Sequence, residues 1–125
     1  RFPADPHVLD GAIMLIETSE TLPSASEVAW ILRAMGERGL LAAVDAVLVA
    51  RPPASSLEDR RDAPARARFR AEQRDAVVET VGRYNPEAVI CVGVPFGHTR
   101  PQWIVPHGGT MTLDGASHRI TASYA

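Results

Sequence analysis

Two ionisable side chains follow apolar runs in this chain of 125 residues. Glu17 comes directly after the run Ala12–Ile16, and His98 lies four residues beyond the run Ala88–Val94, in a Gly-His-Thr turn. The ordinary pKa of a histidine is about 6.5, which suits proton transfer near neutral pH. A carboxylate bonded to one ring nitrogen fixes the tautomer and stabilises the imidazolium. The pair is therefore a candidate general base and orienter if the two strand ends are neighbours. Otherwise the two are an ordinary surface glutamate and a turn histidine.

A nucleophile is harder to find in the chain. No serine lies in a GxSxG motif, and Ser24 is better explained as a helix cap. Ser19 lies two residues from Glu17, but no turn signature exposes it, and Cys91 lies within an apolar run that favours an inert core thiol. All 13 basic residues are arginine, which excludes a lysine Schiff base and a Ser–Lys dyad. The chain thus offers a candidate base and its orienter, but no convincing nucleophile.

Other classes of site are poorly supported. His98, His107 and His118 are separated by nine and eleven residues, which matches no familiar zinc-ligand spacing, and there is no glycine-rich phosphate loop, so we expect no metal and no cofactor. The net charge of −2 argues against a nucleic-acid partner. The arginine-rich stretch Arg51–Arg74 has two interpretations, a nucleic-acid patch or a solvated loop that leads into a helix, and we favour the second. No apolar run is long enough to cross a membrane, and one cysteine allows no internal disulfide. The single cysteine is compatible with a reducing compartment, and we expect a cytoplasmic protein.

The elements that would position these residues alternate between strand and helix. Continuous apolar runs predict buried strands, apolar residues three and four apart predict helices, and alternation around a turn dipeptide predicts a hairpin. The expected order after an extended lead-in, Arg1–Asp10, is strand Gly11–Glu17, a helix capped at Ser24 and stopped at Gly36 and Gly39, strand Val44–Ala50, a helix from about Pro64 to Asn85, strand Ala88–Val94, and a hairpin of Thr110–Leu113 and Ser117–Ser123 around Asp114-Gly115. This order predicts one α/β domain over residues 1–125, with a mixed sheet, flanking helices and a C-terminal β-hairpin.

Several of these segments resemble the C-terminal domain of the LD-carboxypeptidase family. The segments are Leu15-Ile-Glu-Thr-Ser-Glu20, Leu32-Arg-Ala-Met-Gly36, Phe96-Gly-His-Thr-Arg-Pro101 and Ile104-Val-Pro-His-Gly108. The family contains muramoyl-tetrapeptide carboxypeptidases and microcin C self-immunity peptidases, and its members are serine peptidases of two domains. The resemblance implies a swivelling β/β/α-type domain, and runs from about residue 10 to about residue 123.

The resemblance also implies roles for particular residues. Glu17 matches the glutamate and His98 the histidine of a Ser–Glu–His triad, whose serine belongs to an absent N-terminal domain. Substrates would be murein peptides or peptide–nucleotide antibiotics, and the domain alone would be inactive. Arg100 and Trp103 are candidate substrate-binding residues, with simple solvent exposure as the alternative. We expect an exposed apolar patch where the partner domain docks, through which the isolated domain can form a homodimer. The alternative function is a non-catalytic docking module.

Overall fold

Three parallel strands form the central sheet of the computed structural model, which describes residues 5–124. They are β1 (Ile13–Ile16), β2 (Ala46–Ala50) and β3 (Val89–Val94), in the order β1-β2-β3. All five residues of β2 are buried, because this strand has a neighbour on each side and a layer on each face. The continuous apolar run of β2 is typical of such a fully covered parallel strand.

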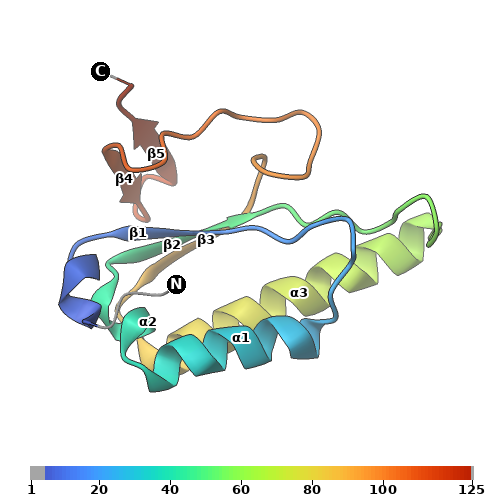
Figure 1. The fold of residues 1–125 in the computed structure, drawn as a ribbon. Coiled ribbons are helices and arrows are strands. Elements are labelled where there is room, and N and C mark those ends of the chain that lie inside the picture. The colour runs from blue at the N-terminus through green and yellow to red at the C-terminus, as the bar shows by residue number, and fades with distance from the viewer. Residues whose placement is uncertain (1–4, 125) are drawn as a thin grey trace.

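The helices cover one face of this sheet (Figure 1). They are α1 (Ala25–Glu37), the short α2 (Leu40–Ala43) and α3 (Ala63–Tyr84). The main core lies between these helices and the sheet, and its fully buried members are Leu41, Val47 and Val81, surrounded by Val28, Leu32, Val44, Val49 and Val77. Burial of this apolar stripe, more than helix propensity, stabilises α1 and α3.

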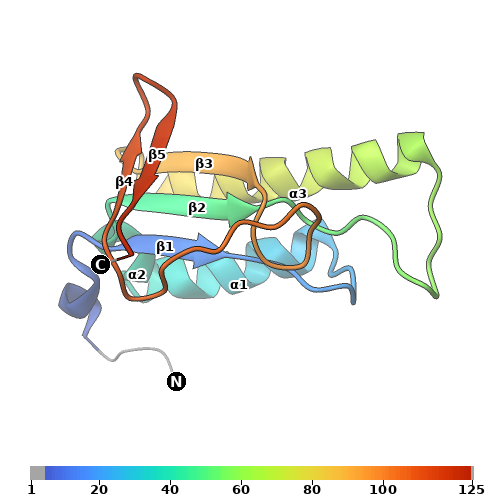
Figure 2. The same cartoon turned by 90° about the horizontal axis from the view of Figure 1, so that it is seen from above.

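The opposite face of the sheet is covered by a C-terminal hairpin of β4 (Met111–Asp114) and β5 (Arg119–Ala122). Its strands run across those of the sheet, and the preceding loop passes the carboxyl ends of β1 and β2 (Figure 2). A second core lies on this side, built from Leu48, Ala50, Val94 and Phe96. The chain therefore forms three layers, with the hairpin, the sheet and the helices in that order.

Alternation along β1 decides which layer each side chain faces. Met14 and Ile16 pack on the core of the helix side, whereas Ile13 and Leu15 pack on the core of the hairpin side. Successive side chains of a strand point to opposite faces, so the next residue, Glu17, belongs to the hairpin side. The strand thus delivers this carboxylate to the face that also carries the loop after β3.

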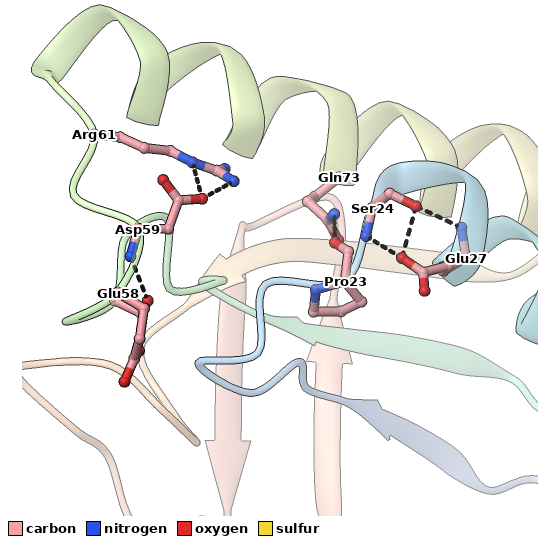
Figure 3. A network of polar contacts seen from close by, with 8 residues as sticks. Pro23, Ser24, Glu27, Glu58, Asp59, Arg61 and Gln73 are labelled. Carbon is pink, nitrogen blue, oxygen red and sulfur yellow. Dashed lines mark hydrogen bonds and ion pairs between the residues drawn. The ribbon is translucent and has the colours of Figure 1, made fainter.

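A capping box and a hydrogen bond from α3 fix the segment between β1 and α1 (Figure 3). Ser24 Oγ accepts from the amide of Glu27 at 3.2 Å, and Glu27 Oε2 accepts from the amide of Ser24 at 2.7 Å, which completes a capping box. The hydrogen bonds that Glu27 Oε2 accepts, from the amide of Ser24 and at 2.8 Å from Ser24 Oγ, lower the pKa of Glu27. Gln73, a buried polar residue of α3, donates from Nε2 to the carbonyl of Pro23 at 2.7 Å. The entry to α1 is therefore tied to α3.

The predicted fold class is confirmed: the chain is α/β, with three parallel strands, flanking helices and a C-terminal hairpin. The hairpin forms a two-stranded sheet of its own instead of extending the parallel one, and its turn spans four residues, 115–118. The prediction of an extended lead-in was wrong over Pro6–Leu9, where the Asp5 side chain caps a 3-10 helix; residues 1–4 lie outside the described part. The short helix α2 was not predicted. Among residues 5–124, no helix has the length and apolarity that a membrane span requires.

The burial of Leu48 in the core on the hairpin side of the sheet allows a simple stability test. Leu48→Ala removes a side chain that is 0% exposed, and should lower the free energy of unfolding by about 2–5 kcal/mol. The matched control Leu57→Ala changes a side chain that is 82% exposed, and should change it by no more than about 0.5 kcal/mol. Urea denaturation followed by circular dichroism measures both. Similar losses in the two variants would contradict the assignment of Leu48 to the core.

Candidate active site

Glu17 and His98 meet at the carboxyl end of the sheet. Nδ1 of His98 lies 3.7 Å from Oε1 of Glu17, and the two side chains are 46% and 44% exposed. The distance is longer than a hydrogen bond but short enough for an ion pair. The two strand ends that carry the predicted pair are therefore neighbours in space.

Gly97 makes this approach possible. Its φ is +71°, in the left-handed region that glycine adopts without steric cost. A Cβ atom at this position would also overlap the carboxylate of Glu17, chiefly at Oε2. The residue before His98 must therefore lack a side chain, which a Gly-His pair in a turn could have suggested from the sequence.

Arg51, at the end of β2, fixes the loop that carries His98. Its Nε donates to Thr99 Oγ1 at 3.0 Å and its Nη2 donates to the carbonyl of Arg100 at 3.3 Å. Its backbone amide donates to the carbonyl of Val94 at 2.8 Å, and Gln102 Nε2 closes the loop by donating to the carbonyl of Gly97 at 2.6 Å. The planar guanidinium suits such a double contact. No local pattern in the sequence indicates this role, because Arg51 is distant from the loop along the chain.

A second carboxylate, which the sequence analysis did not single out, lies on the other side of the imidazole. Oε2 of Glu20 is 3.2 Å from Nε2 of His98, and the Glu20 side chain is 66% exposed. Glu20 follows Glu17 by three residues, within the turn that leaves β1. The ring of His98 thus lies between two carboxylates, one at each nitrogen.

Of the other residues considered in the sequence, two share the loop of His98 and the rest lie elsewhere. Arg100 and Trp103 lie on the loop of His98; Arg100 is exposed, and Trp103 is 52% exposed. Ser19 Oγ shares a hydrogen bond of 2.8 Å with Thr21 Oγ1. Burial raises the pKa of the Cys91 thiol, which disfavours the nucleophilic thiolate. His118 lies in the hairpin turn, away from the loop of His98.

An apolar pocket of about 430 Å³ lies on the helix side of the same sheet edge. Its lining includes Ile16 and Thr18 but neither Glu17 nor His98. Alternation along the strand explains the separation, because the residues on either side of Glu17 point to the helix layer. The candidate pair therefore lies on an open surface and not in this pocket.

Gly97→Ala should disturb the site more than its backbone strain alone explains. The matched control is Gly108→Ala, because Gly108 has a similar φ of +75° and a Cβ atom added there would meet no other atom within 4 Å. Each substitution should cost about 1–2 kcal/mol for the left-handed backbone. Only Gly97→Ala should also displace the Glu17 carboxylate, which carboxyl ¹³C NMR shifts detect. Equal destabilisation, with Glu17 shifts unchanged in both, would contradict the close approach.

Comparison with known proteins identifies proteins that are similar to this chain in sequence or fold. A family model described as the LD-carboxypeptidase C-terminal domain matches residues 1–113. The fold is similar to that of an MccF-like protein from Streptococcus pneumoniae, solved in complex with AMP, with a TM-score of 0.72 and 24% sequence identity. The match covers 98% of this chain and 31% of that chain, so this chain spans less than a third of that protein's length. No curated protein matches the sequence.

The family match and the fold agree with the resemblance found in the sequence. The match extends over most of the chain, from the first residue into the first hairpin strand. Glu17 and His98 both lie inside the matched range, as do Arg100 and Trp103. The chain belongs to the family of LD-carboxypeptidase C-terminal domains.

Proposed function

We propose that this chain supplies the base and the orienter of a serine peptidase, with His98 as the base and Glu17 as the orienter. The observation that carries the proposal is the approach of Glu17 Oε1 to His98 Nδ1, 3.7 Å apart at the carboxyl end of a parallel sheet. Membership of the LD-carboxypeptidase family supports it. The substrate would be an amide bond between an L-centre and a D-residue in a murein peptide, which a cell recycles in its cytoplasm.

The nucleophile would come from an N-terminal domain of the same parent chain. His98 Nε2 would take the proton of the serine hydroxyl as the oxygen attacks the carbonyl carbon, and Glu17 would stabilise the imidazolium. Nε2 would then return the proton to the leaving amine as the C–N bond breaks. A water molecule would release the acyl group by the same proton route, which restores the serine. Without that domain, residues 1–125 would fold but would not hydrolyse the substrate.

The gap of 3.7 Å suits a base that is completed by docking. Catalytic hydrogen bonds are often long in unliganded proteins and tighten in the reactive complex. Both side chains are almost half exposed, so a docked domain would remove water from them. Electrostatic attraction between the imidazolium and the carboxylate strengthens as water leaves.

Arg100 and Trp103 would face the substrate. They share the loop of His98, and both are exposed. A guanidinium can pair with the terminal carboxylate of a D-residue through two parallel hydrogen bonds. An indole offers an apolar surface to the substrate or to the docked domain. Because the MccF-like protein was solved in complex with AMP, a peptide–nucleotide amide is the second substrate class that we propose.

His98→Ala in the full-length parent should lower kcat by about 10²–10⁴-fold, the usual contribution of a general base. Glu17→Gln should lower it as well, because the neutral amide stabilises the imidazolium less. The measurement is release of the terminal D-residue from a murein tetrapeptide. The matched control is His107→Ala, an exposed histidine of the same connecting segment, which should keep full activity.

Wild-type turnover in the His98→Ala parent would refute the proposed base. The domain would then be a docking module that has kept the fold. A fall of equal size in His107→Ala would also count against the proposal, because the loss would then not be specific to His98.

Arg51→Met should lower kcat of the full-length parent by about 10–100-fold, since the loop of His98 loses two hydrogen bonds and shifts. Methionine keeps much of the apolar stem. Arg70→Met is the control, because Arg70 donates to the carbonyl of Pro52 and makes no hydrogen bond to the loop. Equal activity in the two variants would show that Arg51 does not position His98.

A further inference from the structure

The apolar pocket on the helix side of the sheet takes no part in the proposed reaction. Its volume is about 430 Å³, and its walls include side chains that the fold buries, among them Val28, Val49 and Val77. Ligand pockets in proteins usually measure about 300–1,000 Å³ and are lined mainly by apolar side chains. The pocket therefore has the size and the walls of a site for a small molecule.

The length of α3 explains why this space exists. The helix has 22 residues and rises about 1.5 Å per residue, whereas β3 has 6 residues at about 3.3 Å each. The first turns of α3 therefore extend beyond the carboxyl ends of the strands (Figure 2). Ala67 and Ala71 line the pocket from this helix, and their short side chains leave the space beside the sheet edge unfilled.

A β-bulge opens the wall of the pocket at the end of β3. The register of β3 against β2 shifts there, so that Val92 and Gly93 together lie opposite Val49. Gly93 has a φ of +77°, and a Cβ atom at this position would meet no other atom within 4 Å. Glycine inside a strand often marks a place where a ligand approaches the backbone closely. The space beside Gly93 is therefore open to a bound molecule.

The entrance of the pocket is positively charged. Arg51, Arg70 and Arg74 line it, and within the described part of the chain none of the lining residues is acidic. The guanidinium of Arg51 already binds the neighbouring loop. Arg70 uses one of its five N–H groups, from Nε to the carbonyl of Pro52 at 3.3 Å, and Arg74 contacts the exposed carboxylate of Asp75 at 2.9 Å. Because Arg70 and Arg74 are exposed while the apolar walls are buried, their charges lie at the entrance.

We propose that this pocket binds a small amphipathic anion, a molecule with an apolar body and one anionic head group. The apolar body lies against the valines and alanines of the walls, and its removal from water supplies affinity. The head group pairs with Arg70 and Arg74, since a guanidinium can give an anion two parallel hydrogen bonds. The charges select an anion over a neutral or cationic molecule of the same shape. This site goes beyond the proposed peptidase function and does not depend on it.

Decanoate is the probe, and NMR spectra of the valine methyl groups report its binding to residues 1–125 and to the full-length parent. The signals of Val28, Val49 and Val77 should shift in both proteins. Decan-1-ol lacks the charge and inorganic phosphate lacks the apolar body, so each should bind about tenfold more weakly or worse. The parent with His98→Ala should bind decanoate as wild type does, which separates this test from that of the proposed function.

Substitutions on α3 test the apolar and the charged parts of the site separately. Ala71→Leu fills the pocket with a good helix former and should weaken decanoate binding about tenfold, whereas Ala34→Leu, at an exposed site on α1, should not. The double variant Arg70→Gln/Arg74→Gln should also weaken it about tenfold and remove the preference for decanoate over decan-1-ol. Its control is Arg68→Gln, an exposed residue of the same helix that does not line the pocket.

Several results would overturn the proposal. Equal affinities for decanoate and decan-1-ol in wild type, or an unchanged affinity in the double arginine variant, would remove the role of the charge. Binding to residues 1–125 but not to the parent would show that the rest of the parent covers the pocket. A dimer in sedimentation that Ala71→Leu abolishes would show that a second copy of the chain occupies it.

Discussion

Every contact at the candidate site depends on the parallel hydrogen bonding of β2 to both of its neighbours. Ile16 of β1 pairs with Val49, and Val94 of β3 pairs with Ala50, so the carboxyl ends of all three strands reach the same edge. Antiparallel pairing on one side of β2 alone would send Glu17 and the loop of His98 to opposite ends of the sheet, and antiparallel pairing on both sides would move Arg51 away from them. Helices α1 and α3 make the parallel arrangement possible, because each crossover must return the chain to the starting edge. The buried core on both faces of β2 therefore fixes the positions of Glu17 and His98 as well as the fold.

The site concentrates charge around one titratable ring. Two carboxylates, Glu17 and Glu20, flank His98. The guanidinium of Arg51 binds the loop of His98 through Thr99 and Arg100. Exposed ion pairs each contribute about 0.2–1 kcal/mol to stability, so the interactions of Glu17 and Glu20 with the imidazole are both weak. Removal of water from these charges would change their interaction energies by more than that amount. The contacts around His98 are thus weak as long as they are exposed to water, and would strengthen if the proposed domain covered them.

The sequence predicted the parts of this structure that depend on local pattern. The apolar runs located β1, β2 and β3, the Ser24-to-Glu27 spacing predicted the capping box, and Glu17 and His98 were chosen because each follows a strand. It did not predict α2 or the 3-10 helix at Pro6–Leu9, which depend on a left-handed Gly39 and on the Asp5 cap. It also missed Arg51 and Glu20, because their roles come from which loops meet in space. That information lies in the tertiary pairing, and a single sequence does not carry it.

The hydrogen bond from the buried Gln73 to the carbonyl of Pro23 limits how the segment that carries Glu20 can move. The segment that carries Glu20 is held at one end by β1 and at the other by α3, just before the helix cap at Ser24. Its backbone therefore has little freedom to open as a loop. Movement of the Glu20 carboxylate is left to rotation about side-chain bonds, and exposed side chains change rotamer in picoseconds to nanoseconds. The distance between the Glu20 carboxylate and His98 should therefore fluctuate on that time scale, while the backbone that carries Glu20 stays in place.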